Sequence, residues 1–287
     1  MSIDNSLERG AIARQTTPSV VRAALVMAGL AMLVTAVSFA FHAGWAQDLW
    51  PWPDKPLSYV FLGSVLAAIA LPTIWIGATG ELGAIEAGAL DLAITYTCAF
   101  VYLLTILGEP GQPALGAYVA VFGVAAISTI AVVLTVWRTG MRDTRPMPLP
   151  VRVSFYVSAF LLFGAGVCLI AHVNVLPWDP RHESSIIFGF VFLGASVYFI
   201  HGLWRPSWAN AAGQLAGFLA YDVILLVPLL RHANQVHGVQ TVSTVVYSTV
   251  LVLSGLVGIY YLFVARETRL FGGLRSPTTA SPSPTAR

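Results

Sequence analysis

The sequence predicts an all-α membrane protein, a polytopic bundle of eight transmembrane helices. The 287-residue chain is 57% hydrophobic and 10% charged, whereas a soluble domain carries about 25% charged residues. Its mean hydropathy is +0.77. Eight runs also reach about 20 apolar residues, the length that an α-helix needs to cross the hydrocarbon core of a bilayer.

These runs follow one another along the chain, and helix-breaking segments separate them. Glycine and proline fill the gap at 108–113, and arginines with three prolines fill 138–152, the midpoint of the chain. The predicted spans are 23–42, 57–78, 84–107, 114–137, 153–172, 185–204, 209–230 and 241–265.

The midpoint divides the chain into two units of four spans each. The predicted regions are a cytoplasmic N-terminal tail (1–22), a four-helix unit (23–138), a cytoplasmic linker (139–152), a second four-helix unit (153–265) and a disordered cytoplasmic tail rich in Ser, Thr and Pro (266–287).

The orientation follows from the basic residues. With eight spans, only Lys55, Arg181 and Arg231 of the fifteen basic residues fall on the side opposite the termini. Cytoplasmic loops are enriched in Lys and Arg, so both termini are expected in the cytoplasm. The Arg- and Ala-rich composition favours a bacterial source, and hence the bacterial plasma (inner) membrane.

A second interpretation of the N-terminus stays open, in which residues 1–46 are a signal peptide cleaved after Ala46. The apolar run here is longer than the ~7–15 residues usual in signal peptides, which favours a retained helix.

The net charge of +2 offers no basic surface for nucleic acid. The expected partner is the lipid bilayer, with a homo-oligomer or another membrane protein as open alternatives.

The two halves of the chain resemble each other. Spans one and five are each followed by a Trp-Pro segment, and the motif VFLG at 60–63 recurs 131 residues later at 191–194. Asp91 and Asp222 share this offset. We therefore expect a 4+4 internal repeat of two parallel units, related by a pseudo-twofold axis along the membrane normal.

Small residues recur at every fourth position in and before the third span and again in the seventh. The two ladders are Gly80, Ala84 and Gly88, and Ala209, Gly213 and Gly217. Such ladders let a second helix approach closely. The third and seventh spans are thus expected to face each other across the pseudo-twofold axis.

Three acids lie within predicted spans: Glu86, Asp91 and Asp222. A carboxylate inside a bilayer is costly, so it usually faces the bundle interior or a partner. If both aspartates face the axis, they form a central polar site that relays a proton or cation, with Thr95 and Tyr221 as hydrogen-bonding neighbours. The alternative is that each acid only fixes helix packing. Glu86, near the membrane edge, is expected to reach the interface or to pair with an arginine.

His42 and His172 are the weak candidates for a metal or haem site, because both end their spans on the same side and imidazole is the commonest metal ligand. The sequence has no haem-attachment pattern. Ordinary interfacial histidines are therefore favoured, and no cofactor is predicted. His201 is expected to contact an adjacent helix and hydrogen-bond an acid there.

All eight tryptophans lie at or near the ends of predicted spans, which is typical of an aromatic belt that anchors helices at the headgroups. For the Trp-Pro segments, the alternative is a stiff lid over an external cavity.

The segment Trp50-Pro51-Trp52-Pro53-Asp54-Lys55-Pro56-Leu57-Ser58 resembles a loop of bacterial multi-span membrane proteins that has Leu-Thr in place of Asp54-Lys55. The resemblance implies a multi-span membrane fold and no particular activity.

No phosphate-binding glycine loop, nucleophile pattern or zinc-ligand spacing is present, which disfavours an enzyme. The predicted function is transport of a small solute coupled to a proton or cation, with the site at the repeat interface. Two alternatives stay open: a non-catalytic membrane subunit or scaffold, and a haem-binding or redox membrane protein.

Overall fold

The computed structural model describes residues 19–137, 139–233 and 238–268, and this part of the chain is all-helical. Eight of its helices are long and apolar enough to cross a membrane, which confirms the predicted multi-pass membrane protein. They are α2 (Ser19–Ala40), α4 (Pro56–Thr79), α5 (Ile85–Thr105), α6 (Gly116–Val136), α7 (Leu149–Ile170), α8 (His182–Trp204), α9 (Trp208–His232) and α10 (Val239–Ile259). Most of the two predicted tails, and Arg138, lie outside the described residues.

Short elements and special residues set the helix ends. A 3-10 turn (Leu82–Ala84) leads into α5, the four-residue α3 spans Gly44–Gln47, and a π-helical turn (Tyr260–Val264) extends α10. α4 begins at Pro56 and ends at Gly80, whose φ of +75° suits glycine. α7 begins at Leu149 rather than at 153, since a proline in its first turn favours a helix start.

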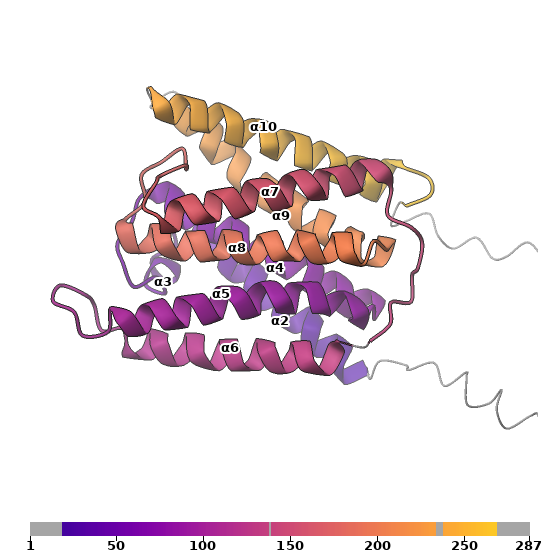
Figure 1. Cartoon of the computed structure of the whole chain (residues 1–287), viewed down its shortest axis with the longest axis horizontal. Coiled ribbons are helices and arrows are strands. Elements are labelled where there is room, and N and C mark those ends of the chain that lie inside the picture. The colour runs from indigo at the N-terminus through magenta and orange to yellow at the C-terminus, as the bar shows by residue number, and fades with distance from the viewer. Residues whose placement is uncertain (1–18, 138, 234–237, 269–287) are drawn as a thin grey trace, which may run out of the picture.

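The eight long helices form two stacked layers (Figure 1). One layer runs in the order α6, α5, α8, α7, and the other runs α2, α4, α9, α10. Within each layer, each helix packs most closely on its immediate neighbours. The two central pairs, α5 with α8 and α4 with α9, therefore each join a helix of the first half of the chain to one of the second half.

The predicted pairing of the third and seventh spans is wrong. α5 packs against α6 and α8, whereas α9 packs against α4 and α10. The ladder of small residues serves these other contacts: a Cβ on Gly217 would lie 2.8 Å from the carbonyl oxygen of Ala68 in α4. A Cβ on Gly88 would meet nothing within 4 Å, so this glycine supports no close helix approach.

Large side chains fill the space between the layers. Near one end of the bundle, the Phe61 ring of α4 lies 4.6 Å from that of Phe188 and 5.4 Å from that of Phe192, both in α8. Near the other end, a second core gathers Phe155, Phe199 and Trp208. Burial of this apolar surface holds the layers together as one bundle.

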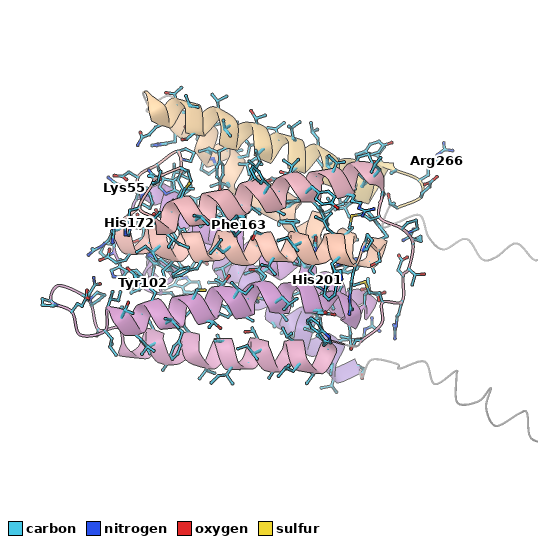
Figure 2. All side chains as sticks on the ribbon, viewed as in Figure 1. Lys55, Tyr102, Phe163, His172, His201 and Arg266 are labelled. Atoms are coloured by element: carbon cyan, nitrogen blue, oxygen red, sulfur yellow. The ribbon has the colours of Figure 1, made fainter. Side chains whose placement is uncertain are left out.

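The two ends of the bundle differ in chemistry. Figure 2 places Lys55, Tyr102 and His172 at one end, and His201 and Arg266 at the other. We call the first the Trp-Pro end, after residues 50–56 and 177–180. We call the second the arginine end, after Arg22, Arg142, Arg145 and Arg205. In the linker at the arginine end, Arg145 pairs with Asp143 at 2.6 Å, and its hydrogen bonds lower the pKa of the Asp143 carboxyl.

Candidate functional site

A buried polar cluster joins three helices at the arginine end. Glu86, in the first turn of α5, is fully buried. Its Oε1 lies 3.2 Å from Nε2 of His201, and its Oε2 lies 2.8 Å from a terminal nitrogen of Arg205. His201 and Arg205 stand one turn apart at the end of α8, so both reach the same acid. Of the two positions expected for Glu86, the structure thus shows the one beside an arginine, and it places His201 next to an acid at ion-pair distance.

Two amides of α9 extend the cluster into the other layer. Asn210 donates to Nδ1 of His201 at 3.3 Å, and Gln214 donates to the carbonyl oxygen of Tyr198 at 3.0 Å. Both amide side chains are buried. With Asn210 donating to Nδ1, the hydrogen of a neutral His201 resides on Nε2, which faces Glu86.

Local sequence brings these groups together. Ser207 caps α9 by accepting the backbone N–H of Asn210, which starts the helix directly beside the end of α8. A Cβ on Gly202 would lie 2.6 Å from Oε1 of Gln214, so only glycine lets this amide reach α8. Asn210 and Gln214 were not among the site residues predicted from the sequence. Two amides one turn apart in an otherwise Ala/Gly/Leu-rich stretch are the signal that could have revealed them.

Asp91 lies further along α5 and faces α8. Thr95 donates to its Oδ1 at 3.3 Å and lies equally close to the carbonyl oxygen of Phe190. A Cβ on Gly194 would lie 2.3 Å from Oδ1 of Asp91 and 2.2 Å from Oγ1 of Thr95. The missing side chain at Gly194 is therefore what lets these two polar side chains pack against α8.

Asp222 lies in the other layer and faces α10. Ser254 donates to its Oδ2 at 2.9 Å, and the side chain is 4% exposed. The adjacent Tyr221 contacts the hydroxyl of Tyr247, also on α10. The structure thus brings Glu86, Asp91 and Thr95 to one helix interface and Asp222 with Tyr221 to another, because α5 and α9 belong to different layers.

The two histidines considered as ligands lie apart. His42 Nε2 is 3.1 Å from the carbonyl oxygen of Pro56, whereas the ring of His172 stacks on that of His182 at 4.3 Å. They follow α2 and α7, which lie in different layers. Within the described residues, no group of three or more His, Cys, Asp and Glu side chains is placed to hold a metal ion.

Both histidines have a left-handed backbone, with φ of +56° at His42 and +62° at His172. This conformation costs a side chain with a Cβ about 1–2 kcal/mol. We expect His172→Gly to keep or raise the thermal stability of the purified protein, and His172→Val to lower it. A haem absorbance band that His172→Gly removes would contradict this backbone role.

Indole groups close the Trp-Pro end of the bundle. Trp50 donates to Ser184 at 3.1 Å, and Trp178 donates to Ser58 at 3.0 Å. Trp52 donates at 2.9 Å to Gln112. The predicted headgroup belt is therefore wrong for part of the set: Trp52, Trp178 and Trp208 are at most 3% exposed and pack in the core.

An acid anchors the same end. Glu183 accepts a hydrogen bond from Gln112 at 2.9 Å and from Arg181 at 2.7 Å. The hydrogen bond to Glu183 raises the pKa of the Arg181 guanidinium, which lies just outside α8. Polar side chains thus tie the helices together at both ends of the bundle.

Two shallow hollows lie at the periphery of the bundle. One, of about 360 Å³, lies against Arg22 and Gly77, and the other, of about 350 Å³, lies against Pro148 and Tyr261. Neither includes the three membrane acids. Comparison with protein-family models, curated proteins and solved structures finds no match for the chain.

Proposed function

We propose that the chain is a proton-coupled transporter of a small solute, whose proton path follows the interface of α5 and α8. The observation that carries this proposal is the pair of acids of α5 that both contact the α8 segment. Glu86 contacts His201 and Arg205, and Asp91 packs at Gly194, all on α8. The two acids are five residues apart, a rise of about 7.5 Å along α5. They form successive steps from the arginine end toward the middle of the membrane.

The orientation of this path rests on charge. Cytoplasmic loops attract Lys and Arg, so we place the arginine end, both termini and the Glu86 cluster on the cytoplasmic side of a bacterial inner membrane. The Trp-Pro end then faces outward, and its indole hydrogen bonds close the bundle on that side.

The proposal includes the 4+4 repeat, which reciprocal contacts support. Trp50 of the first half donates to Ser184 of the second, and Trp178 of the second donates to Ser58 of the first. Ser58 and Ser184 are the third residues of α4 and α8, 126 residues apart. A pseudo-twofold axis that exchanges the layers relates these two contacts.

The same alignment changes the predicted register. The starts of α4 and α8 differ by 126 residues, not 131. At this offset Asp91 corresponds to Gly217, not to Asp222, and His201 corresponds to Trp75. The charged cluster is therefore present once, between α5, α8 and α9, and the positions that match Glu86, Asp91, His201 and Arg205 in the other layer carry no charge. This asymmetry is what a site specialised after duplication would show.

The reciprocal hydrogen bonds give a paired prediction. A hydrogen bond between membrane helices contributes about 0.6 kcal/mol on average and up to about 1.7. We expect Trp50→Phe and Trp178→Phe each to lower the free energy of unfolding in detergent by a similar amount within this range. Trp45→Phe, at an indole that is 52% exposed, is the matched control and is expected to have little effect. A loss at only one of the two hydrogen-bonded tryptophans would count against the repeat.

Proton flux into liposomes tests the proposed function. The purified protein is reconstituted with a trapped pH-sensitive dye, and a pH gradient is imposed with valinomycin and K⁺ to balance charge. We expect faster internal pH change than in protein-free liposomes, and loss of that excess in Asp91→Asn. Asp222→Asn is the matched control, a membrane acid outside the path, and should retain the flux. Wild-type liposomes no faster than protein-free ones would contradict the proposal.

A second candidate is a membrane scaffold, favoured by the filled space between the layers. The core residues Phe61, Phe188 and Phe192 pack their rings against one another between the layers, at 4.6 and 5.4 Å from Phe61. A scaffold predicts that neither Asp91→Asn nor Asp222→Asn changes any flux, and that both acids act only through stability.

A further inference from the structure

We propose that the groove between α2 and α4 at the arginine end binds the headgroup phosphate of an anionic phospholipid, whose acyl chain lies along α2. The inference goes beyond the proposed transport and does not depend on the proton path. It follows from the placement of Arg22, from the apolar surface beside it and from the charge at this end of the two helices.

Arg22 stands in the first turn of α2 and holds the end of α4. Its Nε donates to the carbonyl oxygen of Gly77 at 3.0 Å, and one of its terminal nitrogens donates to that of Ala78. Both carbonyls belong to the last turn of α4, where a helix leaves its carbonyl groups without partners. A guanidinium has five N–H groups. The two bonds thus fix the Arg22 guanidinium and leave three N–H groups, enough for the paired contact that arginine makes with phosphate.

A shallow hollow of about 360 Å³ lies against Arg22, between α2 and α4. Further along the same seam the two helices touch, since a Cβ on Gly63 would lie 2.6 Å from the carbonyl oxygen of Ala36. The hollow is mostly apolar, and its lining includes Ala23, Val26 and Met27 of α2 with Gly77 and Ala78 of α4. It therefore sets an apolar surface directly beside a cation, at the level where α2 begins and α4 ends.

An apolar strip continues from the hollow along α2, the outermost helix of its layer (Figure 1). Met27, Leu30 and Val34 recur at the spacing of one helix face and are 65%, 44% and 62% exposed. An acyl chain whose headgroup is held at Arg22 can lie along this strip. An inorganic phosphate would use the arginine but leave the apolar lining uncovered, so the occupant that fits both parts is a lipid.

The charge beside the hollow favours an anion. A terminal nitrogen of Arg142 and Nε of Arg22 would lie 3.3 and 3.6 Å from a Cβ on Gly80, so two guanidinium groups approach the same glycine. The acid next to them, Glu81, accepts the backbone N–H of Arg142 at 2.6 Å. With Glu81 counted, these three groups keep one positive charge. Basic pockets between membrane helices are places where anionic headgroups bind.

Binding of a fluorescent phosphatidylglycerol to the purified, delipidated full chain in detergent tests the proposal. We expect unlabelled phosphatidylglycerol to displace the labelled lipid. Phosphatidylcholine with the same acyl chains, and inorganic phosphate, should leave it bound at equal concentration. Arg22→Gln removes one cation and is expected to weaken binding about fivefold. Arg152→Gln is the matched control and should leave the affinity unchanged, because Arg152 is an exposed arginine in the first turn of α7 and lines neither hollow.

A second variant tests the hollow without touching the arginine. Ala23 is exposed, so Ala23→Phe is expected to fill the hollow and weaken binding while thermal stability stays near that of wild type. Equal weakening by Arg22→Gln and Arg152→Gln would overturn the site, as would equal displacement by phosphatidylcholine or an unchanged affinity in Ala23→Phe. Displacement by inorganic phosphate would show a plain anion site and overturn the lipid. If Arg22→Gln does not fold, Ala23→Phe and the two competitors decide.

Discussion

Replacing Gly194 with alanine is expected to disrupt the α5–α8 interface. The added Cβ would lie 2.2 Å from Oγ1 of Thr95, 2.3 Å from Oδ1 of Asp91 and 2.7 Å from the Asp91 carbonyl oxygen. The last of these is a backbone atom, so the helices themselves must separate. Overpacking of this kind costs about 1–3 kcal/mol and occasionally more. We expect a marked drop in thermal stability in detergent, together with loss of proton flux.

The chain offers a matched control for this substitution. Gly164 lies within α7, and a Cβ there would meet nothing within 4 Å. Gly164→Ala is expected to leave stability unchanged or to raise it slightly, because alanine favours a helix by about 1 kcal/mol over glycine. Equal stability of the Gly194 and Gly164 variants would mean that α5 and α8 do not pack as closely as the structure shows.

Removing the arginine of the buried cluster is the second change with a large expected effect. Arg205→Ala leaves the fully buried Glu86 carboxylate without its cation at 2.8 Å. Breaking a fully buried ion pair by removing one partner costs about 3–5 kcal/mol. The Arg205 side chain is 31% exposed, so solvent screening is expected to bring the cost to the lower end of this range or below it. Removal of both partners, in Glu86→Gln with Arg205→Ala, is expected to cost less than Arg205→Ala alone, since no unpaired charge is then buried.

The other end of the bundle supplies the comparison. Arg181 pairs with Glu183 at 2.7 Å, but the Arg181 side chain is 41% exposed. An exposed pair contributes about 0–1 kcal/mol, so Arg181→Ala is expected to have a small effect. Unfolding followed in detergent measures all three variants. A double variant no more stable than Arg205→Ala would show that the cost comes from lost packing rather than from the stranded charge.

Hydropathy was enough to predict the eight spans, because a bilayer imposes nearly the same length on every helix that crosses it. Local breakers also placed most helix ends within four residues, as Pro56 and Gly80 do for α4. The partner of His201 was predictable in kind, since a histidine near a span end needs a polar group once it is buried.

The arrangement of the helices was not predictable from the sequence. Asp91 and Asp222 lie 131 residues apart, the offset of the VFLG motif, and this match favoured a shared site. However, α5 and α9 lie in different layers, so Asp91 faces α8 and Asp222 faces α10. The loop between α2 and α4 is longer than the loop between α7 and α8. The two halves therefore do not align at one constant offset, and residues that match at such an offset need not be structurally equivalent. The burial of Trp52 and Trp178 depends on acceptors distant in sequence, Gln112 and Ser58, which local pattern does not reveal.

Cross-linking between helices tests the central claim, that α5 packs on α8 and carries the acids there. In a chain whose Cys98 and Cys168 are replaced by alanine, cysteines are placed at Tyr102 and Phe190, whose rings lie 6.1 Å apart. A short bifunctional thiol reagent is expected to join this pair and to leave a Gly88→Cys, Gly217→Cys pair unlinked. Linkage of the Gly88 and Gly217 positions without linkage of the first pair would contradict the layered arrangement and the proton path that depends on it.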